Sequence, residues 1–237
     1  MEAVVNKIIP FSAVDGPGNR TAIFLQGCNF NCQYCHNPET IGKKNPYTKL
    51  MTPEEVMAEV EKNIPFVRGI TVSGGECTLQ ADFLKELFTL AKSRGLTTLV
   101  DSNGSYAFDE DLELLSVMDG AMIDIKAFFP EDHKRITGQD NEIVWKQSRF
   151  LAEQGKLFEI RTVISPELFD AKETVNQICR FFEEYNKKKS IRYKLIAFRP
   201  MGVRKAYVKG LTVPEEAFMK ELKSIAESYG FTDIIII

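Results

Sequence analysis

The chain has 237 residues, of which 44% are apolar and 27% are charged. This balance is typical of a globular protein, and a chain of this length can bury a large core without disulfide bonds. The 30 basic and 33 acidic side chains give a net charge of −3, without the basic excess that nucleic-acid binding requires. No apolar stretch approaches the roughly 20 residues that span a bilayer. We therefore expect a cytoplasmic protein without nucleic-acid or membrane partners.

Short β-branched runs alternate with amphipathic stretches along the chain. The expected order is strand 21–26, helix 52–62, strand 69–73, helix 79–94, strand 96–101, helix 109–118, strand 121–126, helices 131–138 and 142–155, strand 157–164, helix 171–185, strand 192–198 and helix 214–230. This alternation predicts right-handed βαβ units and a parallel sheet. The fold class is therefore α/β, a partial (β/α)6 TIM-like barrel of parallel strands in one domain, residues 1–237. The isoleucine run 234–237 should be paired or covered, since an exposed apolar edge aggregates.

Polar or cysteine-bearing segments follow several of these strands. In parallel α/β folds, functional groups collect where the carboxyl ends of the strands meet the following loops. Five such segments qualify, at residues 26–28, 73–76, 101–104, 124–126 and 199–200. We expect them to form a single site.

Three of the five cysteines, Cys28, Cys32 and Cys35, fall within eight residues. Thiolates are the ligands of iron–sulfur clusters, and a cubane cluster held by three cysteines leaves one iron open, as a catalytic metal site requires. The alternative is a structural zinc ion completed by His36, although its adjacency to Cys35 makes that geometry awkward. Cys77 and Cys179 are expected to be buried in the core.

The spacing Cys28-x-x-x-Cys32-x-x-Cys35, with Tyr34 before the last cysteine, resembles the signature of radical S-adenosylmethionine (SAM) enzymes. Segments 11–20 and 35–40 resemble a narrower group, the glycyl radical enzyme activating enzymes, which include the pyruvate formate-lyase activases. Segments 71–76, 99–104, 119–127 and 136–140 are most similar to the YjjW-type activases. The ferredoxin-like insert of many such enzymes is missing, since residues 41–51 are a short link without cysteines. The resemblance runs from about residue 7 to beyond residue 203.

This resemblance implies a radical SAM oxidoreductase with an oxygen-sensitive [4Fe-4S] cluster on the three cysteines and SAM at its open iron. The implied SAM-binding residues are Tyr34, His36, Gly74, Gly75, Glu76, Ile125, Lys126, Ala127 and Arg199. Glu76 would accept hydrogen bonds from the SAM ammonium group, and Lys126 would bind the SAM carboxylate. Arg199 stands where the pyruvate formate-lyase activase has a histidine, so this position departs from the family. A monovalent cation would bind at Asp101, Ser102, Met122 and Asp124.

The implied reaction is the reductive cleavage of SAM to a 5′-deoxyadenosyl radical, which abstracts a hydrogen atom from a glycine of a partner enzyme. That glycyl radical enzyme would present its glycine on a loop in contact with Asp15, Gly16 and Gly18. An external flavodoxin or ferredoxin would supply the electron, because no cysteines remain for auxiliary clusters. Arg204, Lys205 and Lys209 are candidates for docking the partner.

Two alternatives stay open at this stage. One is a radical SAM enzyme that acts on a small molecule or a peptide. The other is a zinc-stabilised binding module without catalysis, which metal content would distinguish.

Overall fold

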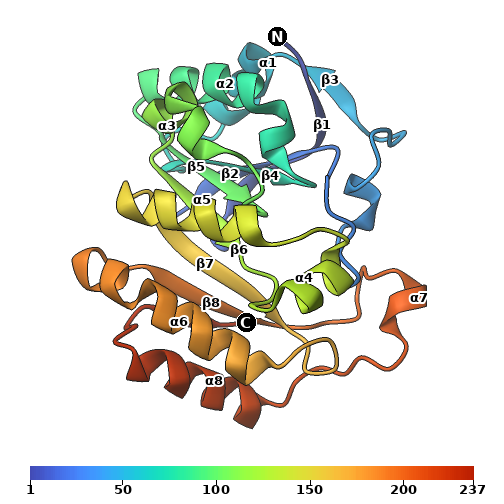
Figure 1. Ribbon diagram of the computed structural model, residues 1–237. Helices are drawn as coiled ribbons and strands as arrows, with labels where there is room; N and C mark the ends of the chain where they lie inside the picture. Colours follow the sequence, from blue (N-terminus) through green and yellow to red (C-terminus); the bar gives the residue numbers. More distant parts are fainter. The chain divides into compact units, whose positions relative to one another are not determined.

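The protein alternates strands and helices along most of its length (Figure 1). The computed structural model describes residues 1–237. Its strands have the order β3-β1-β2-β4-β5-β6-β7-β8-β9 in one sheet, and because β3 and β9 are not neighbours the sheet is not closed. Two compact units make up the chain: Met1–Asn29, Glu39–Ser102 and Tyr106–Met122 in the first, and Phe30–Pro38, Asn103–Ser105 and Ile123–Ile237 in the second.

The first unit combines strands with three helices. Its strands are β1 (Ala3–Ser12), β2 (Arg20–Leu25), β3 (Lys49–Met51), β4 (Gly69–Gly74), β5 (Thr97–Ser102) and the first residues of β6 (Gly120–Asp124). Its helices are α1 (Pro53–Glu61), α2 (Ala81–Ser93) and α3 (Leu112–Val117), with the short 3-10 turns η2 (Cys77–Gln80) and η3 (Phe108–Glu110). Strands β2, β4 and β5 are parallel. Both α1 and α3 pack against α2 (Figure 1).

The second unit combines the segments Phe30–Pro38 and Asn103–Ser105 with the chain from Ile123 onward, and it contains most of the helices. Its elements are α4 (Pro130–Thr137), α5 (Glu142–Glu153), β7 (Leu157–Ile164), α6 (Ala171–Lys188), β8 (Arg192–Ala197), α7 (Lys205–Val208), α8 (Glu216–Ser228) and β9 (Ile234–Ile236). Strands β7, β8 and β9 are parallel. Helix α6 packs against both α5 and α8 (Figure 1).

Local sequence signals set several helix boundaries. The Thr52 side chain accepts from the Glu55 N–H while the Glu55 carboxylate accepts from the Thr52 N–H, which is a capping box at the start of α1. Helix α4 begins at Pro130 and ends before Gly138, whose φ of 82° is the left-handed conformation that favours glycine. Strands β2, β4 and β6 are mostly buried, as parallel strands covered on both faces require, whereas the edge strands β3 and β9 are half-buried or exposed.

The fold prediction is confirmed in class, and each expected helix and strand is present in the expected order, with boundaries that shift by a few residues. Strands β1 and β3 and helix α7 were not predicted, and β1 adds an antiparallel edge to the mostly parallel sheet because it pairs antiparallel with both β2 and β3. The reason is the length of the link from β1 to β2, residues 13–19. A link this short permits antiparallel pairing, whereas a parallel pair needs a longer crossover.

The isoleucine-rich end of the chain is paired, as predicted. Strand β9 lies parallel to β8, with Tyr193 opposite Ile234 and Leu195 opposite Ile236. The assignment of residues 1–237 to one domain stays a prediction. None of the helices combines the length and apolar character needed to cross a membrane.

Candidate functional site

The start of the cysteine loop and the Gly-Gly-Glu turn are joined in the first unit, at the carboxyl ends of β2 and β4. The Gly75 N–H donates to the Leu25 carbonyl at 3.0 Å, and the Glu76 N–H donates to the Gly27 carbonyl at 2.7 Å. Main-chain hydrogen bonds therefore tie the backbone just before Cys28 to the turn that carries Glu76.

Glycine is required at both positions of this turn because the neighbouring atoms are backbone. A Cβ at Gly75 would lie 2.2 Å from the Gly27 oxygen and 2.7 Å from the Thr40 oxygen. Gly74 has a φ of 132°, and a Cβ there would lie 2.1 Å from the Leu25 oxygen. Both glycines are thus required by the backbone of Leu25, Gly27 and Thr40, which flanks the cysteine loop. Their contact with SAM stays a prediction.

The Glu76 carboxylate is buried and well supplied with donors. Its Oε1 accepts from the Thr78 N–H at 3.1 Å, the Thr78 hydroxyl at 2.6 Å and the Ser102 hydroxyl at 2.9 Å. These donors hold the carboxylate in one orientation. Sequence reasoning missed Thr78, although a hydroxyl two residues after a carboxylate at a helix start is a recognisable local signal.

Asp101 and Cys77 pack beside the same turn in the first unit. The Ser73 hydroxyl donates to Asp101 Oδ2 at 2.9 Å. The Cys77 thiol donates to the Val72 carbonyl at 3.3 Å and the Asp101 carbonyl at 3.5 Å, and burial raises its pKa well above the ordinary value. Cys77 is therefore a buried neutral thiol, as predicted. Of the expected cation ligands, Asp101, Ser102 and the fully buried Met122 lie in this unit and Asp124 lies in the other.

The predicted partner contacts lie at the opposite end of the first unit. Asp15, Gly16 and Gly18 link the end of β1 to the start of β2, hence they sit at the amino ends of the parallel strands. The Asp15 carbonyl accepts from the Thr71 hydroxyl at 2.5 Å, and its Oδ2 accepts from the Ser12 hydroxyl at 2.5 Å. Thr71 lies three residues before Gly74 in β4, so at about 3.3 Å per strand residue the Asp15 carbonyl is roughly 10 Å from the Gly-Gly-Glu turn.

The other two cysteines of the motif lie in the second unit with Tyr34. The Cys35 N–H donates to the Cys32 carbonyl at 3.3 Å. Burial raises the pKa of the Cys32 thiol; Lys126 opposes this shift and Cys35 adds to it. The Tyr34 hydroxyl is buried without a hydrogen-bond partner. A buried hydroxyl in this state is a group that a bound ligand can satisfy.

Lys126 forms an ion pair at the end of β6. Its Nζ lies 2.6 Å from Asp124 Oδ2, and the lysine is buried while the aspartate is half-buried. Burial alone would lower the pKa of Lys126, but Asp124, Cys32 and Tyr34 together raise it well above the ordinary value. The ammonium group therefore stays charged. The side chains of Ile125 and Ala127 are buried, so only their backbones are available to a ligand.

His36 and Arg199 are brought together in the second unit. The His36 Nε2 lies 3.0 Å from the Arg199 carbonyl, whereas the Arg199 side chain is exposed. Gly202 has a φ of 84°, and a Cβ there would lie 2.3 Å from the His36 oxygen. All three residues line a pocket of about 380 Å³, with Ile237 also in its wall.

The thiols available in the chain suit a cluster. The five cysteines lie outside disulfide bonds, with Cys32 buried and both Cys28 and Cys35 half-buried. Cys28 belongs to the first unit and the other two to the second. No group of three or more His, Cys, Asp or Glu side chains that could hold a metal ion is found within residues 1–237, so the three-cysteine site stays a prediction.

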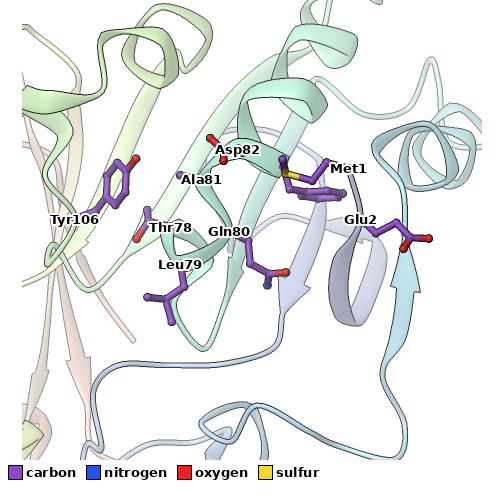
Figure 2. A pocket seen from close by; sticks show the side chains of 9 residues that line it. Met1, Glu2, Thr78, Leu79, Gln80, Ala81, Asp82 and Tyr106 are labelled. Carbon is purple, nitrogen blue, oxygen red and sulfur yellow. The ribbon is translucent and has the colours of Figure 1, made fainter.

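Another pocket of the first unit contains none of the expected residues. It has a volume of about 410 Å³ and is lined by Met1, Glu2, Thr78, Leu79, Gln80, Ala81, Asp82, Phe83 and Tyr106 (Figure 2). Thr78 links this pocket with the site, because the same side chain donates to Glu76.

Comparison with known proteins identifies the class. The family model described as the radical SAM superfamily matches residues 22–178. A domain of a pyruvate-formate lyase-activating enzyme from Bacteroides vulgatus shares the fold, with a TM-score of 0.58 and 20% identity over 71% of this chain and 98% of that one. Streptococcus suis SuiB, solved with bound S-adenosylmethionine, gives a TM-score of 0.67 and 14% identity over 90% of this chain and 48% of that one. The chain belongs to the radical SAM superfamily.

Relatives with higher sequence identity identify the family within this superfamily. The pyruvate formate-lyase-activating enzyme of Streptococcus mutans is 36% identical over 90% of this chain and 84% of its own length. The pyruvate formate-lyase 1-activating enzyme of Escherichia coli K12 is 31% identical over 96% of this chain and 98% of its own length. A Haemophilus influenzae protein, provisionally named a glycyl-radical enzyme activating enzyme, is 33% identical over 98% of this chain and 96% of its own length. Within the superfamily, the chain is a member of the glycyl-radical enzyme activating family.

Proposed function

We propose that this enzyme activates a glycyl radical enzyme by removing a hydrogen atom from one of its glycine residues. The observation that carries the proposal is the likeness to activating enzymes, at 31% to 36% identity over 90% or more of the chain. That alignment length takes in the cysteine motif, the Gly-Gly-Glu turn and the Asp124–Lys126 strand end together. A match to the cysteine motif alone would support only membership of the radical SAM superfamily.

Cys28, Cys32 and Cys35 would hold a [4Fe-4S] cluster, because thiolates are the soft ligands that such clusters take and none of the three cysteines is in a disulfide bond. When bound, the cluster and SAM supply the radical chemistry: one electron cleaves SAM to methionine and a 5′-deoxyadenosyl radical, which takes a hydrogen atom from the partner's glycine. The protein's own part is to bind, to orient the reacting groups and to exclude other hydrogen donors.

Glu76 and Lys126 would bind the two charged groups of the SAM methionine. Glu76 is already oriented by Thr78 and Ser102, so it can accept from an ammonium group without reorganisation. The charged Lys126 suits a carboxylate. The backbones of Gly74, Gly75, Ile125 and Ala127 would complete this part of the site.

Tyr34, His36 and Arg199 would contact the nucleoside of SAM in the second unit. The unpartnered Tyr34 hydroxyl and the pocket beside His36 and Arg199 support this assignment. A monovalent cation would bind through Asp101, Ser102, Met122 and Asp124. The hard oxygen atoms of Asp101 and Ser102 in the first unit support that part of the proposal.

The partner's glycine loop would contact Asp15, Gly16 and Gly18. Because this segment lies roughly 10 Å from the Gly-Gly-Glu turn along the strands, a loop that reaches both needs about three extended residues. A flavodoxin or ferredoxin would supply the electron, and the enzyme would work in the cytoplasm. The net charge of −3 favours neither nucleic acid nor an anionic membrane surface as a partner.

The test pairs the reconstituted, reduced enzyme and SAM with a glycyl radical enzyme grown with deuterated glycine. We expect a glycyl radical in the electron paramagnetic resonance spectrum, together with deuterium in the 5′-deoxyadenosine released. Cleavage of SAM without either signal, against the glycyl radical enzymes of the same cell, would contradict the activase function. It would point to a small-molecule or peptide substrate instead.

A further inference from the structure

The cysteine loop of the second unit is held from one side by helix α4. The Asn31 N–H donates to the Thr137 carbonyl at 2.8 Å, and the Gln33 N–H donates to the Ile136 carbonyl at 2.9 Å. The Gln33 side chain adds a bond from Nε2 to the Arg135 carbonyl at 2.8 Å. Carbonyl groups in the last turn of α4 thus accept hydrogen bonds from the N–H groups of this loop. The carbonyl groups of the loop need donors from elsewhere.

Arg204 supplies those donors from the start of α7. Its Nη2 donates to the Cys32 carbonyl at 2.9 Å and to the Asn31 carbonyl at 3.3 Å, while Nη1 donates to Asn31 Oδ1 at 2.6 Å. The guanidinium lies 4.6 Å from the centre of the Tyr207 ring, which supports it from the other face. Its Nε is buried without a hydrogen-bond partner. The guanidinium group therefore binds the cysteine loop, although Arg204 and Cys32 are 172 positions apart in the sequence.

Arginine is suited to this role for two physical reasons. Its planar fork offers several donors in fixed directions, so one side chain can hold two consecutive residues of backbone. Its charge is permanent, and hydrogen bonds from a charged donor are stronger than neutral ones. Lysine would keep the charge but lose the fork.

We propose that Arg204 is a positioning residue for the cluster. It fixes the backbone of Asn31 and Cys32 in the conformation that receives iron and sulfide, and it places a permanent positive charge against the main chain of one cluster ligand, Cys32. That charge favours the reduced cluster, which is the more negative state. The inference rests on the proposed function only in requiring a cluster on these cysteines.

The first test needs no cluster. Amide hydrogen exchange in the metal-free full-length protein would compare wild type with Arg204→Gln and with Lys134→Gln, which removes an exposed charge from α4. We expect the Asn31 and Gln33 amides to exchange at least about tenfold faster in Arg204→Gln, since a hydrogen bond from a charged donor is lost. Lys134→Gln should match wild type. Equal protection in Arg204→Gln and wild type would overturn the inference.

The second test uses the reconstituted enzyme without SAM or partner. Arg204→Gln should release iron to a chelator at least about tenfold faster and should show a more negative midpoint potential. Arg204→Lys should keep the wild-type potential yet release iron faster than wild type. If Arg204→Gln releases iron at the wild-type rate and keeps the wild-type midpoint potential, Arg204 does not position the cluster. If Arg204→Lys also releases iron at the wild-type rate, the planar guanidinium group is not needed.

A second substitution covers the case in which Arg204→Gln fails to fold. Tyr207→Leu leaves the guanidinium in place and removes the ring beneath it, so iron release should rise about threefold, in line with an exposed cation–π contact. No change would count against the inference. A wild-type enzyme that holds its cluster but forms no glycyl radical would contradict the proposed function and leave the role of Arg204 intact.

Discussion

The two units supply their parts of the candidate site in different ways. In the first unit, the part around Glu76 is made by close backbone contacts, with Gly75 against Gly27 and main-chain bonds between the two loops. In the second unit, charged side chains do the equivalent work, through the Lys126–Asp124 pair and the Arg204 fork. A backbone contact leaves no room for adjustment, whereas a charged side chain can be weakened by degrees. Substitutions at the close backbone contacts of the first unit should therefore abolish function. Substitutions of the charged side chains in the second unit should only reduce it.

The largest effect should come from Gly75→Ala. The added Cβ would meet two carbonyl oxygens that belong to backbone, so we expect a loss of about 3 kcal/mol in the free energy of unfolding and loss of SAM cleavage. Chemical denaturation of the metal-free protein would measure the first effect. Gly42→Ala is the control, because its nearest atom lies 3.8 Å away and its stability should barely change. A stable, active Gly75→Ala enzyme would contradict the claim that close backbone contacts build the part of the site in the first unit.

Glu76→Gln should be the next most damaging change. The buried carboxylate accepts three hydrogen bonds through one oxygen, and an amide accepts them less strongly. We expect a loss of about 2 kcal/mol in the unfolding free energy, and at least tenfold weaker SAM binding if the ammonium contact is correct. Glu110→Gln, at an exposed position of the same unit, should change neither. Unaltered SAM affinity with reduced stability would leave Glu76 a purely structural role.

Lys126→Met tests the second unit. Removing the ammonium group leaves the half-buried Asp124 without its partner, and it removes the proposed contact with the SAM carboxylate. We expect SAM affinity, measured by calorimetry on the reconstituted enzyme, to fall about tenfold, with about 1 kcal/mol lost in stability. Lys134→Met is the matched control on an exposed lysine. Equal affinities for wild type and Lys126→Met would exclude the carboxylate contact.

The smallest effect is expected for Arg199→Ala. The side chain is exposed, and an exposed ionic contact contributes at most about 1 kcal/mol, so SAM affinity should fall by less than about fivefold. The same calorimetry would measure it. A larger loss would mean that Arg199 closes over SAM when it binds.

Individual strands and residues show how much of the fold and of the candidate site could be predicted from the sequence. Parallel strands and the order of the helices followed from hydrophobic patterns, which are local. The antiparallel β1 did not, because its pairing depends on the short link to β2 and on a distant edge strand, β3. Gly75 was expected as a SAM-binding residue, but its close contact with Gly27 was not predicted, since that contact joins two separate loops.

Arg204 shows the same limit for the site. Its sequence context, next to Lys205 and near Lys209, indicated a surface for the partner. Its observed bonds to Asn31 and Cys32 reach across 172 positions, and no local pattern encodes such a contact. Lys205 and Lys209 are exposed and stay candidates for partner docking.

The central claim is that three cysteines hold one cluster that cleaves SAM, and anaerobic reconstitution with iron and sulfide tests it most directly. We expect about four iron atoms per chain and 5′-deoxyadenosine on reduction with SAM. Cys28→Ala, Cys32→Ala and Cys35→Ala should each abolish the product, whereas Cys179→Ala, at a buried position in α6, should keep it. A colourless protein loaded with zinc, or SAM cleavage that survives loss of Cys28, Cys32 or Cys35, would contradict the account.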